Sequence, residues 1–175
     1  MKFCSILFIL ISFFFFISCH KDSETNECTL SKVVAGTVNN KVIIANHNVY
    51  ASVGACPSYC PITTIQASAG VAPYDTTFNF SLFATSTTTC TLGKWGGKSD
   101  STHMWGGEAS YTISKGPSIR EGYRTDSLFN GTLTITRFDK EKKEIEGTFN
   151  FIGRQLMTSD TITLQITNGS FKVCY

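Results

Sequence analysis

Charge of either sign, proline and histidine are all scarce in this chain. Only 16% of its 175 residues are charged, four are proline and three are histidine. The formal net charge is +2 and the basic residues form no run, so the electrostatic footprint of a nucleic-acid-binding protein is missing. The 42% hydrophobic content also excludes a disordered or collagen-like chain. We therefore expect a folded domain with no nucleic-acid partner.

Helical periodicity and familiar catalytic motifs are missing as well. No stretch of ten or more residues shows clean helical periodicity, and there is no Gly-x-Ser-x-Gly. Beyond residue 30 the only histidines are His47 and His103, too few for a zinc site of about four ligands. Glu144 and Glu146 have the spacing of a carboxylate pair on one strand face, but beside two lysines we interpret them as a solvated face. The sequence thus predicts no catalytic residue, no metal site and no cofactor.

The longest apolar run lies at the N-terminus. Met1 and Lys2 give a short positive start, and residues 6–17 are apolar except for Ser12. Twelve helical residues span about 18 Å, which is short of the roughly 30 Å hydrocarbon core of a bilayer. We interpret residues 1–18 as the helix of a signal peptide rather than as a membrane span.

A cysteine stands where the apolar run ends. The sequence Phe16-Ile17-Ser18-Cys19, followed by a polar stretch, resembles the lipobox of bacterial lipoproteins, although Phe16 replaces the usual leucine. The resemblance implies that Cys19 is acylated and becomes the first residue of the mature chain. Several acyl chains anchor a protein more firmly than one does, so we expect a lipid-anchored outer-membrane protein with residues 19–29 as a tether. It could face the cell surface or the periplasm; an ordinary secretion signal with a chance cysteine is the alternative.

Five of the seven cysteines would remain in the folded domain once Cys4 is cleaved off and Cys19 is acylated. They are Cys28, Cys56, Cys60, Cys90 and Cys174. An oxidising compartment permits two disulfides and one free thiol among them, in pairings that the sequence cannot select. Three residues separate Cys56 from Cys60, whereas a redox Cys-x-x-Cys motif has two. We expect a loop closed by a local disulfide or by a bridge to Cys90 or Cys28.

Threonine-rich alternation predicts strands along a single domain, residues 30–175. Residues 132–136 and 144–151 alternate in polarity around the charged segment 139–143, which predicts a hairpin. Residues 161–167 alternate again, and Asn168-Gly169 predicts a tight turn into a last strand. Further strand candidates are residues 33–38, 41–45, 49–53, 62–67, 78–83, 109–114 and 123–126. We expect an all-β antiparallel meander that forms a β-sandwich or an up-and-down, lipocalin-like barrel of about 8–11 short strands.

Three C-terminal segments carry a family resemblance. They are Gly131-Thr-Leu-Thr-Ile-Thr-Arg-Phe-Asp139, Glu146-Gly-Thr-Phe-Asn-Phe151 and Ile166-Thr-Asn-Gly-Ser-Phe-Lys-Val173. Together they resemble a family of small Bacteroidota lipoproteins of unknown function. The resemblance implies an all-β envelope domain behind a lipobox, with Phe149, Phe151, Gly169 and Phe171 as core and turn positions. It supplies no catalytic motif.

The most irregular segment, residues 92–108, is the best candidate for a ligand loop. It holds both tryptophans, Trp95 and Trp105, and each is followed by Gly-Gly. Exposed tryptophans can stack on sugar rings, and glycine lets the backbone approach a ligand closely. The alternative is that each ring closes one end of the sandwich. His103 lies in the same loop but has no second ligand at a defined spacing, so we include it only as a loop residue.

These features favour a non-catalytic binding or accessory module of the cell envelope. Its expected partners are the membrane, through the lipid anchor, and a glycan or an envelope protein. Two alternatives stay open at this point: an envelope hydrolase acting on a glycan or ester, and a structural subunit that docks another outer-membrane protein.

Overall fold

The computed structural model describes residues 31–55, 61–72, 74–84, 86–93, 106–156 and 161–175, and this part of the chain is all-β. The strands are β1 (Val33–Val38), β2 (Lys41–Ala45), β3 (His47–Ala55), β4 (Pro61–Val71), β5 (Tyr74–Leu82), β6 (Thr88–Leu92), β7 (Gly107–Ser114), β8 (Arg120–Arg124), β9 (Gly131–Asp139), β10 (Glu144–Gln155) and β11 (Thr163–Cys174). The prediction of an all-β domain is confirmed. Within the described residues, no helix has the length and apolar character needed to cross a bilayer.

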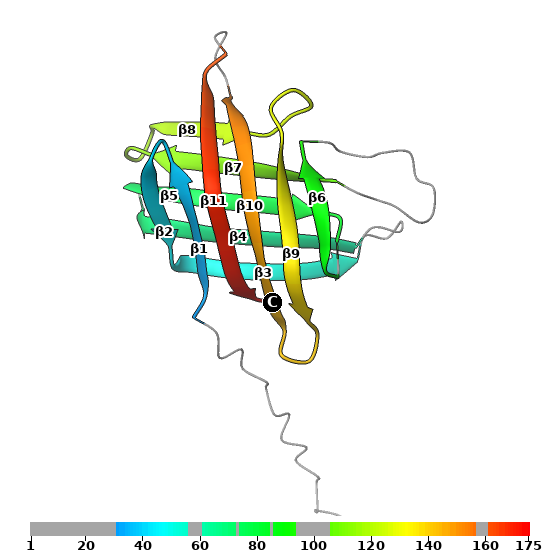
Figure 1. Ribbon diagram of the computed structural model, residues 1–175. Helices are drawn as coiled ribbons and strands as arrows, with labels where there is room; N and C mark the ends of the chain where they lie inside the picture. Colours follow the sequence, from blue (N-terminus) through cyan, green and yellow to red (C-terminus); the bar gives the residue numbers. More distant parts are fainter. Residues whose placement is uncertain (1–30, 56–60, 73, 85, 94–105, 157–160) are drawn as a thin grey trace, which may run out of the picture.

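All eleven strands belong to one sheet that folds over on itself. Its order is β2-β1-β11-β10-β9-β6-β7-β5-β4-β3, and β8 pairs with both β10 and β7. In Figure 1, strands β1, β2, β6, β9, β10 and β11 form one layer, and β3, β4, β5, β7 and β8 run across them in a second layer. The result resembles a sandwich whose layers are joined through the β6–β7 and β8–β10 pairs. The β6–β7 pair is parallel, so the sheet is mixed rather than the purely antiparallel meander expected.

Aromatic rings from both layers meet in the core. Phe78 and Phe80 come from β5, and Phe149 and Phe151 come from β10; all four are at most 3% exposed. The ring centroid of Phe149 lies 4.6 Å from that of Phe80 and 5.8 Å from that of Phe78, distances at which aromatic pairs add to the energy of burial. Phe149 therefore joins the two layers at the centre of the molecule.

The glycines of the C-terminal motif lie directly beneath these and neighbouring rings. Cross-strand register places Gly147 opposite Phe171 and Gly169 opposite Phe149. A Cβ at Gly147 would lie 2.4 Å from the Phe171 ring, and a Cβ at Gly169 would lie 2.4 Å from the Phe149 ring. No real Cβ approaches so closely, so only glycine fits at either position. Each glycine of the motif is thus covered by the aromatic ring opposite it on the paired strand, an arrangement that helps to fix strand register.

The predicted turn at Asn168-Gly169 is wrong. Strand β11 continues through both residues, and its pairing with β10 skips from Gly169 opposite Phe149 to Ile166 opposite Phe151. Three steps on β11 therefore match two on β10, which defines a β-bulge. Asn168 has φ of 51°, in the left-handed region that Asn tolerates better than most residues. Asn-Gly supplies this backbone geometry equally to a hairpin turn and to a bulge.

The hairpin predicted around residues 139–143 is confirmed. Strand β9 ends at Asp139 and β10 begins at Glu144, with Glu144 paired to Asp139. Lys143 completes the turn with φ of 53°. This hairpin and the residues packed beside it form the candidate site described next.

Candidate functional site

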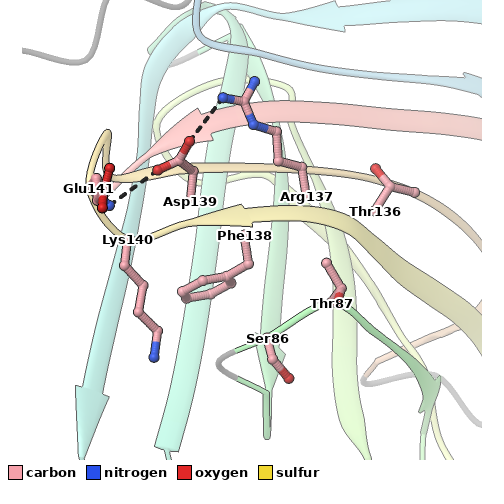
Figure 2. A pocket seen from close by; sticks show the side chains of 8 residues that line it. All are labelled: Ser86, Thr87, Thr136, Arg137, Phe138, Asp139, Lys140 and Glu141. Carbon is pink, nitrogen blue, oxygen red and sulfur yellow. Dashed lines mark hydrogen bonds and ion pairs between the residues drawn. The ribbon is translucent and has the colours of Figure 1, made fainter.

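A groove of about 600 Å³ lies beside the β9–β10 hairpin. It is lined by Ser86, Thr87, Thr136, Arg137, Phe138, Asp139, Lys140 and Glu141. Figure 2 shows that the Phe138 ring and the Lys140 side chain lie on the same side of β9 as Ser86 and Thr87. Arg137 and Asp139 extend to the opposite side of the strand. The groove thus has one wall suited to ligand contact and one edge held by charge pairs.

Long-range strand pairing brings the two halves of the groove together. Strand β6 pairs with β9 from Thr88 opposite Ile135 to Leu92 opposite Gly131. Ser86 and Thr87 immediately precede β6, so this pairing places their hydroxyls beside the end of β9. On the other side, Asp139 Oδ1 accepts hydrogen bonds from the backbone N–H groups of Glu141 at 3.1 Å and Lys142 at 2.9 Å. These bonds fix the turn that carries Lys140.

Three carboxylates converge on Arg137 along the outer edge of the hairpin. Its Nη2 lies 3.0 Å from Asp139 Oδ2 and 2.9 Å from Glu144 Oε2, and its Nη1 lies 3.3 Å from Glu146 Oε1. Lys172 Nζ contacts the other Glu146 oxygen at 3.4 Å. The Glu144 contact is an ion pair rather than a hydrogen bond, because its geometry satisfies only the distance condition. These charge pairs link side chains of β9, β10 and β11.

The expectation of a solvated face at Glu144 and Glu146 is wrong for Glu144. Its side chain is only 5% exposed, whereas that of Glu146 is 21% exposed. A buried carboxylate needs a partner because burial without one is costly, and Arg137 supplies it. The strand face is predicted correctly from the alternation, but the arginine that reaches Glu144 from the paired strand is not.

Hydrogen bonds keep Asp139 ionised. Hydrogen bonding from the Lys142 backbone N–H, followed by that from Arg137, lowers the pKa of Asp139 below its ordinary value. The hydrogen bond to Asp139 in turn raises the pKa of Arg137. Since the folded-state pKa of Asp139 is the lower one, its contribution to stability is present above the unfolded value of about 3.9. That contribution is lost as the pH falls through the folded-state pKa. Near neutral pH Asp139 is a saturated structural acceptor, not a proton donor.

The opposite wall offers one partly exposed aromatic ring and three exposed polar side chains. The Phe138 ring packs against Tyr175, with ring centroids 5.4 Å apart, and is only partly buried. Lys140 is exposed and forms no ion pair with any described residue. Ser86 and Thr87 are exposed hydroxyl residues. Together they provide a ring for stacking, a cation and two hydroxyls within one concave surface.

Most of the site residues expected from the sequence lie outside the described residues. This applies to Cys19, to the ligand-loop residues Trp95, His103 and Trp105, and to Cys28, Cys56 and Cys60. Cys90 is a free thiol buried on β6, so the expected bridge from the 56–60 loop to Cys90 is not formed. Burial raises the pKa of this thiol. Cys174 forms a disulfide whose partner lies outside the described residues. His47 is exposed at the start of β3.

Comparison with known proteins identifies one family. Residues 31–173 match the model of a domain family described as a domain of unknown function, DUF6252. No curated protein and no solved structure matches the chain.

Proposed function

Because the chain belongs to the DUF6252 family, whose function is unknown, we propose from its own residues that it is a non-catalytic binding module of the cell envelope. The hairpin groove is its ligand site, and a lipid on Cys19 holds it at the outer membrane. The expected membership of a family of unknown function is confirmed by the match over residues 31–173. The observation that carries the proposal is the groove wall of Phe138, Lys140, Ser86 and Thr87.

The chemistry of this wall fits an acidic saccharide. One face of a sugar ring is apolar and stacks on an aromatic side chain, while its hydroxyls bond to Ser86 and Thr87. A carboxylate on the same ring would pair with Lys140, the groove cation that no described carboxylate engages. The groove volume of about 600 Å³ lies in the range of small-ligand sites. Asp139 and Arg137 also line the groove, but their charges are paired with each other.

Replacing Lys140 with alanine tests the ligand proposal. We expect galacturonate oligomers to bind the wild-type protein and to bind Lys140→Ala at least about tenfold more weakly, because a charge-assisted hydrogen bond contributes roughly 1.5–3 kcal/mol. Isothermal titration calorimetry measures the difference. Lys142→Ala is the matched control, since it removes the same charge from the same turn but not from the groove lining. Equal affinity of both variants, or no binding of acidic oligomers to the wild type, would contradict the proposal.

The proposed anchor has its own test. Cys19→Ser should move the full chain from the membrane fraction to the soluble fraction and remove the mass of the acyl chains. Release should be nearly complete when the variant is expressed behind a cleavable secretion signal in place of residues 1–18, because no apolar segment long enough to span a bilayer then remains. Fractionation and intact-mass spectrometry measure it. Continued membrane association with an unchanged mass would rule out lipidation.

A further inference from the structure

The outer face of the second layer carries a straight row of hydrogen-bonding side chains. Cross-strand register pairs Tyr50 with Gln66, Gln66 with Asn79, Asn79 with Ser110, and Ser110 with Arg124. The adjacent residues along each strand, such as Ile65 and Phe80, are fully buried. Because side chains alternate across a sheet, the row faces outward. We call these five residues, Tyr50, Gln66, Asn79, Ser110 and Arg124, the amide row; it crosses β3, β4, β5, β7 and β8.

The two ends of the amide row are well suited to ligand contact. Tyr50 is 46% exposed, and its hydroxyl donates to Gln66 Oε1 at 2.7 Å. This bond leaves the Gln66 amide nitrogen to donate elsewhere and holds the tyrosine ring in place. At the far end Arg124 Nε pairs with Glu108 Oε1 at 3.0 Å, and the arginine side chain is 51% exposed. A ring and a guanidinium thus mark the two ends of the row.

The centre of the row contains an acceptor that the fold leaves unsatisfied. Asn79 Oδ1 is inaccessible to solvent, and no described residue donates a hydrogen bond to it. Buried polar atoms in native proteins nearly always have a partner, so an exception calls for an explanation. Asn79 lies between Gln66 and Ser110 in register. A ligand hydroxyl laid over this point of the row would supply the missing donor once the Asn79 side chain rotates outward, because Oδ1 is covered in its present position.

The surroundings of the row are polar and electrically neutral. Flanking positions on the same face carry hydroxyls: Ser52, Thr64 and Ser81 on one side, and Thr77 and Thr112 on the other, where Thr77 is hydrogen-bonded to the buried Ser68. Arg124 pairs with Glu108, and Arg154, which lies opposite Arg124 in register, pairs with Asp126, so these charges compensate one another. A neutral face rich in hydroxyls and amides matches a neutral polyhydroxylated ligand and gives no attraction to a polyanion.

The spacing of the row matches a polymer with a short repeat. Neighbouring strands lie about 4.8 Å apart, which is close to the length of one sugar ring in an extended polysaccharide. Each strand can therefore present one side chain to each successive sugar. We propose that the amide row binds an extended, neutral, β-1,4-linked polysaccharide, which lies across β3 to β8 with one ring stacked on Tyr50. This surface is separate from the hairpin groove and does not depend on it.

Affinity electrophoresis of the full chain in gels containing a neutral polysaccharide tests this proposal. The probes are hydroxyethyl cellulose, xylan and glucomannan, with polygalacturonate as the charged comparison. We expect at least one neutral polymer to retard the wild-type protein. Tyr50→Ala and Gln66→Ala should each weaken retardation about tenfold, the loss expected for one stacking or hydrogen-bonding contact. Asn79→Ala should weaken it as well.

Matched substitutions on the other layer provide the control. Gln165→Ala and Asn150→Ala remove the same side chains from exposed positions of β11 and β10, so they should leave retardation unchanged. Circular dichroism melting of every variant separates a binding loss from unfolding. The proposal is overturned if no neutral polymer retards the wild type, if only polygalacturonate does, or if the Gln165 and Asn150 variants lose as much retardation as the amide-row variants. Lys140→Ala should retain neutral-polymer binding.

Discussion

Gly147→Ala is expected to lower the free energy of unfolding by about 3 kcal/mol, the upper part of the range for overpacking a core. A Cβ at this position would lie 2.2 Å from the Thr134 carbonyl oxygen and 2.4 Å from the Phe171 ring. The ring could rotate, but the carbonyl belongs to the paired strand β9 and cannot move without breaking the ladder. Chemical denaturation of the purified protein, followed by tryptophan fluorescence or circular dichroism, measures the loss.

Gly54→Ala is the matched control, because it makes the same substitution in a strand without a clash. No heavy atom lies within 4 Å of a Cβ built at Gly54. Removing a glycine from such a position reduces the conformational freedom of the unfolded chain, so Gly54→Ala should be neutral or stabilise by up to about 1 kcal/mol. If Gly147→Ala and Gly54→Ala have the same stability, the close packing described for the family motif is incorrect.

The parts of the fold that could be predicted from the sequence are those in which one face of a strand is uniformly apolar. Strands β9 and β10 alternate clearly, and the charged segment between them has no alternative to a turn. The sequence does not predict strand β6, because its inward positions, Cys90 and Leu92, are interrupted by threonines that suit either face. In such a segment the pairing with β9, rather than the local pattern, determines that a strand forms.

The Asn168-Gly169 error has the same origin. The dipeptide specifies a left-handed backbone, and only the partner strand decides whether that backbone reverses the chain or bulges. Here β10 pairs with β11 on both sides of Asn168, so the strand continues. Asn-Gly determines the local backbone conformation, and long-range pairing determines whether that conformation forms a turn or a bulge.

The candidate sites were beyond prediction for a geometric reason. The turn that carries Lys140 was evident from its charge, but Ser86 and Thr87 reach the groove only through the β6–β9 pairing. Similarly, successive residues of the amide row are between 13 and 31 positions apart in the sequence, and only the register of four strand pairs shows that they are neighbours. Because the strands are rich in threonine, the sequence pattern does not indicate which polar face would bind a ligand.

Phe149→Ala is expected to destabilise the protein by about 3–5 kcal/mol, the usual range for truncating a buried phenylalanine. The side chain is 3% exposed and its ring contacts those of Phe78, Phe80 and Phe151. It also covers Gly169, so truncation opens a cavity over a backbone that has no side chain of its own. Denaturant unfolding gives the change in free energy.

Phe149→Leu separates the aromatic contribution from the loss of volume. Leucine keeps most of the buried area, so this variant should lose less than about 1.5 kcal/mol if filling the space is what matters. A larger loss would show that the edge and tilted contacts with the two β5 rings supply much of the stability. Because β5 lies in the second layer and β10 in the first, either variant should weaken the contact between layers. Nearly wild-type stability of Phe149→Ala would contradict a core organised around this ring.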